Sequence, residues 1–189
     1  MNPREHTLLA SVATDDLDVR FARFVQDHRA RAVSIAWRLL GKDRGAAEDV
    51  AQDAFLKAYT ALPRFRQDAS FETWFYRILV RQASNHRRWR GVRERWSGLL
   101  GAWLGQESVT REPLSDPGLQ QRIAQAIDGL SKQQREAFVL VRLEDFSVRE
   151  AAEVMGCAPG TVKSHLYRAG ENLQKALGDL VETSQGGTP

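Results

Sequence analysis

The chain has 189 residues, of which 42% are hydrophobic and 27% charged, close to the averages of globular proteins, which argues against extensive disorder. No apolar run approaches the ~20 residues of a membrane-spanning helix, and the N-terminal residues lack the long apolar core of an export signal. The one cysteine, Cys157, cannot form an internal disulfide. We therefore expect a cytoplasmic chain with no membrane insertion and with neither a metal nor another cofactor.

The first two predicted helices carry apolar residues at the spacing of three and four that is typical of amphipathic helices. In the first, this stripe begins at Phe21 and continues to Leu39. His28 lies on the stripe, so we interpret it as a packed core residue rather than a ligand. The second helix ends at Pro63 and is predicted to bury Ala47, Val50, Ala51, Ala54, Phe55, Ala58 and Leu62.

A third helix is predicted from about Ser70, and it carries most of the excess positive charge. The whole chain has a net charge of +3, but residues 64–95 hold nine arginines against three acidic residues. Such a block of one sign favours a polyanionic partner, and nucleic acid in particular. The apolar stripe makes Trp74 and Phe75 core residues rather than stacking platforms, and leaves Tyr76 as the more exposed aromatic residue.

Residues 96–118 break the helical pattern with repeated glycine and proline, which predicts a linker between two helical domains. The first half is unusual for a linker, because residues 96–104 contain large apolar side chains, among them Trp96 and Trp103. One interpretation is a helical extension that packs on the first domain. The other is a docking segment for a protein partner.

The second domain is predicted to begin near Leu119. Ser131 and Ser147 each begin a capping box, in which the serine and the residue three positions later satisfy free backbone N–H groups at a helix start. After Ser147 a short helix, a turn at Gly156 and a new helix from Pro159 match the pattern of a helix-turn-helix, whose second helix enters the DNA major groove.

In this second helix an apolar seam predicts which side chains remain outside. Val162, Leu166, Ala169, Leu173 and Leu177 are expected to face inward, and Cys157 packs with them as a core thiol. The outward and flanking residues suit contacts with phosphates and base edges; they are Thr161, Lys163, Ser164, Tyr167 and Arg168.

Three motifs follow one another along the chain: AAEDVAQDAFLKAY (46–59), FRQDASFETWFYRILVRQASNHRRWR (65–90) and LSKQQREAFVLVRLEDFSVREAAEVMGCAPGTVKSHLYRAGENL (130–173). In this order they resemble the extracytoplasmic-function (ECF) group of the sigma-70 family of bacterial RNA polymerase sigma factors. The resemblance implies an all-α fold of two small helical domains, similar to sigma regions 2 and 4 and joined by a flexible linker. The implied division is an N-terminal extension (1–19), a region 2-like domain (20–95), a linker (96–118), a region 4-like helix-turn-helix domain (119–182) and a disordered tail (183–189).

The resemblance also implies a role for each surface. The acidic helix would bind core RNA polymerase through Asp49, Gln52, Asp53 and Leu56. The arginine-rich helix would recognise and open the −10 promoter element through Tyr76, Arg77, Arg81, Asn85, Arg87 and Arg88. The five outward residues of the second domain would read the −35 element.

The implied partners are core RNA polymerase, promoter DNA and an anti-sigma factor, with no obligate homo-oligomer. An enzyme is the first alternative, but no catalytic or phosphate-binding motif is present and the histidines are scattered. The second alternative is a helix-turn-helix regulator that acts without polymerase, which would leave the acidic and arginine-rich helices without a role. The third, a pure interaction module, does not explain the arginine block.

Overall fold

A computed structural model describes the backbone of residues 3–41, 43–65, 70–104 and 117–185, and the side chains of 17–41, 43–65, 70–89, 118 and 121–178. Within these residues the chain forms helices and no strand. The first group of helices is α1 (Pro3–Leu39), α2 (Arg44–Ala61) and α3 (Phe71–Leu104). The second group is α4 (Pro117–Asp128), α5 (Lys132–Phe138), α6 (Val148–Met155) and α7 (Pro159–Gln185). The all-α fold with two helical domains is confirmed.

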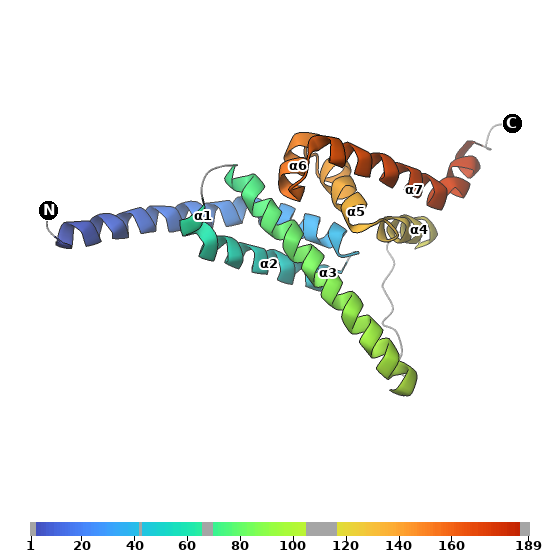
Figure 1. The fold of residues 1–189 in the computed structure, drawn as a ribbon, viewed down its shortest axis with the longest axis horizontal. Helices are drawn as coiled ribbons and strands as arrows, with labels where there is room; N and C mark the ends of the chain where they lie inside the picture. Colours follow the sequence, from blue (N-terminus) through green and yellow to red (C-terminus); the bar gives the residue numbers. More distant parts are fainter. Residues whose placement is uncertain (1–2, 42, 66–69, 105–116, 186–189) are drawn as a thin grey trace.

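In the first domain α1 and α2 lie antiparallel, and α3 crosses both of them (Figure 1). The N-terminal ends of α2 and α3 are each capped by a side chain close in the sequence. The Asp43 side chain accepts a hydrogen bond from the Ala46 N–H, and the Ser70 hydroxyl accepts one from the Thr73 N–H, both at 3.1 Å. At its C-terminal end α2 passes into a short 3₁₀ helix, η1 (Leu62–Arg64), at Pro63.

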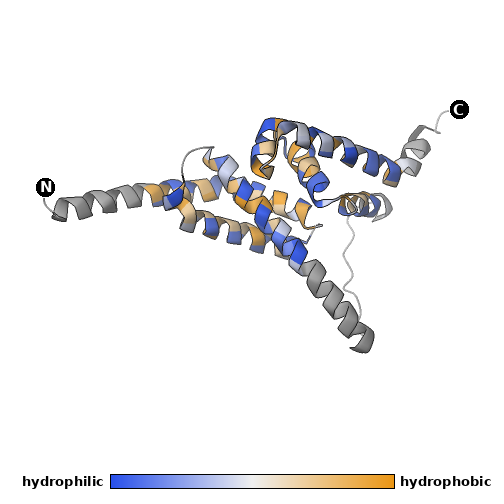
Figure 2. Cartoon of the chain, viewed as in Figure 1, coloured by the Kyte–Doolittle hydropathy of each residue, from blue (hydrophilic) through white to orange (hydrophobic). Residues whose placement is uncertain are grey.

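Most of the core of this domain follows the apolar spacing of the sequence. Every predicted inward residue of α2 is buried, and on α3 Phe75 and Leu79 are fully buried. Phe75 stacks on Phe55, with ring centroids 4.4 Å apart, and meets the edge of Phe24 at 5.2 Å. In Figure 2 the helices carry hydrophobic and hydrophilic residues side by side, as amphipathic helices do.

In the second domain both capping boxes are present, at Ser131 and Ser147, and the helices begin where they were predicted. Gly156 ends α6 with a φ of +67°. Its N–H donates to the Glu153 carbonyl and that of Cys157 to the Ala152 carbonyl, the two hydrogen bonds of a Schellman motif. Pro159 then opens α7, so the helix-turn-helix geometry follows the sequence pattern closely.

The structure differs from the sequence-based boundaries in four places, one of them at the C-terminus, where α7 continues to Gln185 and residues 183–185 of the expected disordered tail are helical. α1 begins at Pro3 rather than near Phe21, so most of the predicted N-terminal extension is helical. α3 continues to Leu104 and α4 begins at Pro117, which leaves only 105–116 of the expected linker outside the helices. That segment, the side chains of 96–104 and residues 186–189 lie outside the described parts of the chain.

The two domains also pack against each other, which the sequence did not predict. α6 lies against α3, and the π-helical segment η2 (Val139–Leu143) lies against α1. Figure 1 shows α6 beside the first turns of α3. The turn after η2 contains Asp145 in the left-handed region, with a φ of +58°, a conformation that aspartate tolerates better than most residues. This turn directs Glu144 and Phe146 toward the first domain.

Candidate polymerase and nucleic-acid interfaces

The outer face of α2 carries the four residues predicted to bind core polymerase, and all four are exposed. Because the inner face of α2 packs between α1 and α3, Asp49, Gln52 and Asp53 remain in solvent. Leu56 is 57% exposed, a large apolar side chain with acidic residues about one turn away. Such a surface offers apolar area and negative charge to a basic partner.

One face of α3 carries a row of three exposed side chains, those of Arg81, Asn85 and Arg88. Their spacing of four and three residues places them on one side of the helix. Trp89 lies beside them and is 70% exposed, an unusual position for an indole. Trp89 was not among the predicted site residues, although its place one turn after Asn85 is visible in the spacing.

Two further arginines of α3 are engaged by the second domain. Arg77 donates from Nε and Nη2 to the Glu153 carbonyl, at 3.0 and 2.8 Å. Arg87 donates from Nη2 to the Asp128 carbonyl at 3.2 Å, and its Nη1 lies 3.4 Å from Asp128 Oδ1. Both predicted −10 residues are therefore hydrogen-bonded to the second domain in this arrangement, although Arg77 remains exposed and Arg87 is partly exposed.

The prediction that Tyr76 is exposed is wrong. Its side chain is fully buried, its hydroxyl shares a 3.0 Å hydrogen bond with His28 Nδ1, and the Phe146 ring meets its own edge-on. Burial raises the pKa of Tyr76 to about 12. The spacing did not reveal this because Phe146 comes from the other domain. His28, which stacks on Phe24, is a packed residue as expected.

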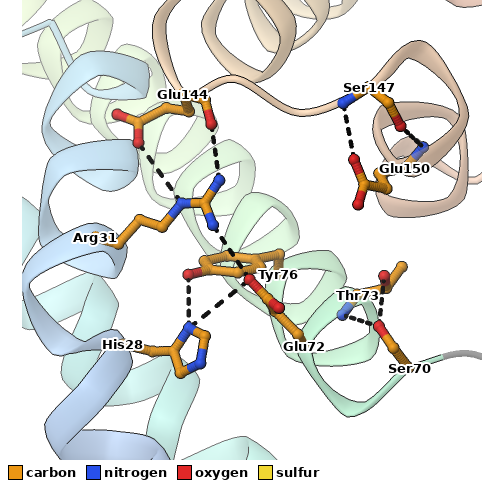
Figure 3. Close-up of polar contacts among 9 residues, drawn as sticks. All are labelled: His28, Arg31, Ser70, Glu72, Thr73, Tyr76, Glu144, Ser147 and Glu150. Carbon is orange, nitrogen blue, oxygen red and sulfur yellow. Dashed lines mark hydrogen bonds and ion pairs between the residues drawn. The ribbon is translucent and has the colours of Figure 1, made fainter.

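A polar network joins the two domains beside Tyr76 (Figure 3). The Arg31 guanidinium donates to the Glu144 carbonyl at 2.7 Å and to Glu72 Oε1 at 3.2 Å. The Glu144 carboxylate accepts from the Ser34 hydroxyl at 2.8 Å and pairs with Arg38 Nε at 2.9 Å. Only 7% of the Glu144 side chain is exposed, so these partners take the place of water around the carboxylate.

The second helix of the helix-turn-helix, α7, presents all five predicted −35 residues to solvent. Tyr167 is 70% exposed, whereas Val162 and Ala169 on the opposite side are fully buried. The Ser164 hydroxyl donates to the Gly160 carbonyl at 3.1 Å, so its oxygen is also available to accept. The face thus combines hydroxyl groups with a lysine and an arginine near the start of a helix.

Cys157 is half-buried at the turn between α6 and α7 and packs against the core. Burial, with a smaller effect from Glu136, raises the pKa of its thiol, which keeps the sulfur protonated and weakly nucleophilic. Among the described residues no group of histidine, cysteine and acidic side chains is arranged to hold a metal ion. In the same residues no helix is both long and apolar enough to span a membrane.

Family models match both domains: "Sigma-70 region 2" matches residues 24–92 and "Sigma-70, region 4" matches residues 120–173. The chain is 39% identical to the RNA polymerase sigma-H factor of Pseudomonas aeruginosa over 149 residues, which cover 74% of this chain and 77% of that protein. It is 34% identical to the ECF RNA polymerase sigma-E factor of Escherichia coli K12 over 146 residues, covering 72% and 76%.

Two solved structures share the fold. One is the sigma factor RpoE in complex with the anti-sigma factor NepR from Bartonella quintana, with a TM-score of 0.64 and 30% identity over 84% of this chain and 96% of that one. The other is CnrH in complex with the cytosolic domain of CnrY, with a TM-score of 0.65 and 26% identity over 91% and 96%.

Proposed function

The chain belongs to the ECF group of the sigma-70 family, and we propose that its two domains divide promoter recognition between them. The region 2-like domain (20–95) would bind core RNA polymerase and open the −10 element. The region 4-like domain (119–182) would bind the −35 element, with 96–118 connecting them. Sigma factors are regulatory subunits, so the proposal assigns no catalytic step to this chain and places it in the cytoplasm with the polymerase.

The polymerase contact is proposed for Asp49, Gln52, Asp53 and Leu56 on α2. The supporting observation is that exposed acidic residues lie within about one turn of Leu56, which is 57% exposed, while the opposite face of the helix is buried. A basic helix of the polymerase would gain orientation from the carboxylates and buried area from the leucine.

The −10 contact is proposed for the arginines and Asn85 of α3. Strand opening requires cations along the phosphate backbone and groups that capture an unstacked base. Arg81, Arg88 and Asn85 are exposed together, and Trp89 adds a ring on which a base can stack. Arg77 and Arg87 would join them when the second domain moves away, and the same movement would remove Phe146 from Tyr76 and make that ring more accessible to DNA.

The −35 contact is proposed for Thr161, Lys163, Ser164, Tyr167 and Arg168. The observation that carries the proposal is that α7 is the second helix of a well-formed helix-turn-helix and exposes all five of these side chains. Lys163 and Arg168 would contact phosphates or guanine edges, and the hydroxyl groups would position the helix in the groove.

An anti-sigma factor is proposed as the regulator. The sigma factor RpoE, which has the same fold, was solved in complex with the anti-sigma factor NepR, and CnrH, of the same fold, was solved with the cytosolic domain of CnrY. The apolar segment 96–104 is a candidate contact for it.

The alternative is a helix-turn-helix regulator that binds DNA without polymerase. Band-shift assays on promoter fragments, with the protein alone and with added core polymerase, separate the two. A sigma factor binds promoters tightly only when the polymerase is present. Tight binding to specific duplex sites by the protein alone, unchanged by polymerase, would favour the regulator and reject the proposal.

A further inference from the structure

We propose that Glu144 and Phe146 form a latch that closes the second domain over α3 in the DNA-free protein and thereby withholds Arg77 and Arg87 from DNA. The part of this inference that concerns DNA rests on the proposed function. The closure itself rests on the contacts between the domains.

Glu144 is placed to hold the two domains together. Its carboxylate is nearly inaccessible, and the partners described for it, Ser34, Arg38 and Arg31, all lie on α1 of the first domain. If the domains separated, the carboxylate and both arginines would regain water, which offsets much of the lost pairing. A contact of this kind can hold the two domains together and still allow them to separate at a modest cost in free energy.

Phe146 supplies the apolar half of the latch. Its ring meets Tyr76 at 90° with centroids 5.3 Å apart, and the Arg31 guanidinium lies 4.5 Å from the ring centroid. Only 7% of Phe146 is exposed. Edge-on aromatic pairs and cation–π contacts both add to the burial of apolar area, so this residue favours the closed arrangement.

The groups that accept hydrogen bonds from Arg77 and Arg87 are negatively polarised, as the phosphate groups of a DNA backbone are negatively charged. Arg77 binds the Glu153 carbonyl in the last turn of α6, and Arg87 binds the carbonyl of Asp128, the last residue of α4. The C-terminal end of a helix carries a partial negative charge. The second domain therefore presents two negative helix ends to two arginines that the proposal assigns to promoter phosphates, and the phosphates would compete with these carbonyls for the same N–H groups.

The masking is unequal between the two promoter elements. The −35 residues Lys163, Tyr167 and Arg168 are exposed on α7 in the closed arrangement, whereas Arg77 and Arg87 are engaged. Opening the latch should therefore strengthen binding of single-stranded DNA and leave binding of −35 duplex DNA nearly unchanged. This asymmetry is what separates a latch from a general loss of structure.

A charge swap tests the latch. Glu144→Arg places a third cation beside Arg31 and Arg38 and should open the chain, and Arg38→Glu should open it by carboxylate repulsion. The backbone φ of −125° at position 144 accepts any L residue, so Glu144→Arg need not disturb the turn. The double variant Arg38→Glu/Glu144→Arg restores an opposite pair and the original net charge, and should close the chain again.

The readouts are the radius of gyration of the free full chain by small-angle X-ray scattering and its affinity for a short single-stranded DNA of mixed sequence. Both single variants should expand the chain, and the double variant should not. If closed molecules outnumber open ones by about ten to one, Glu144→Arg should bind the single strand about tenfold more tightly. Glu171→Arg, an exposed change on α7, adds the same charge away from the interface and corrects for simple attraction.

Unchanged scattering in both single variants would overturn the latch. So would expansion with no gain in single-strand affinity beyond that of Glu171→Arg, because the arginines would then not be masked. Scattering does not depend on polymerase. A failure of the proposed sigma function would instead appear as polymerase-independent promoter binding, with the scattering result unaffected.

Discussion

Replacing Gly156 with alanine should destabilise the second domain, although the new methyl group meets no neighbour. No atom lies within 4 Å of a Cβ built at this position, so steric contact contributes nothing. The φ of +67° does contribute, because the left-handed conformation costs an ordinary L residue roughly 1–2 kcal/mol. Alanine also restricts the unfolded chain, which returns about 0.4–1 kcal/mol. We expect a net loss of about 1 kcal/mol.

Gly170 offers a matched control on the next helix. It lies within α7, is exposed, and also has no atom within 4 Å of a built Cβ, but its φ is not positive. Gly170→Ala should therefore stabilise the domain by about 0.5–1 kcal/mol, the usual advantage of alanine over glycine in a helix. The same chemical change is expected to have opposite signs at the two positions.

Urea unfolding followed by circular dichroism measures both variants, and hydrogen exchange of amides in α6 and α7 assigns the change to this domain. The chain has two domains, so the exchange data are needed to interpret the unfolding curve. Shifts of the same sign in both variants, or a stable Gly156→Ala, would refute the argument that backbone conformation at the turn decides the outcome.

Three further changes test the proposed surfaces and one buried carboxylate. Asp53→Ala should weaken binding to core polymerase several-fold in a fluorescence titration, whereas Asp27→Ala, an exposed change on α1, should not; equal affinities would reject the α2 surface. Arg168→Ala should cost roughly 1–3 kcal/mol on −35 duplex DNA but spare loading on a pre-melted template, and equal losses on both would reject its role. Burial raises the pKa of Glu136, so the folded chain holds this proton more tightly and stability falls as pH rises from the ordinary glutamate pKa through the raised one. Glu136→Gln should reduce that slope in unfolding curves measured across pH, and an unchanged slope would contradict the assignment.

Much of the fold could be read from local patterns, because helix starts, turns and apolar stripes depend on residues within a few positions of each other. The capping boxes at Ser131 and Ser147, the positive φ at Gly156 and the buried seam of α2 all follow such patterns. The outward residues of α2 and α7 could be predicted for the same reason, because residues outside the apolar stripe of a helix face solvent.

The contacts between the domains could not be predicted in this way. Ser34 and Glu144 are separated by 110 residues, and no spacing rule relates them. Tyr76 was expected on the surface because it lies beside the apolar stripe of α3 and not on it. The ring that covers it belongs to Phe146 of the second domain. The burial of a residue at a domain interface depends on the packing of the other domain, which a single helix does not encode.

Run-off transcription tests the central claim most directly. Core bacterial RNA polymerase is incubated with a pool of genomic promoter fragments, with and without this protein. The account predicts transcripts that start at discrete sites only when the protein is present, and their upstream sequences should share −35 and −10 elements. Transcription that is unchanged by the protein, together with tight binding of specific duplex sites by the protein alone, would contradict its assignment as a promoter-directing sigma factor.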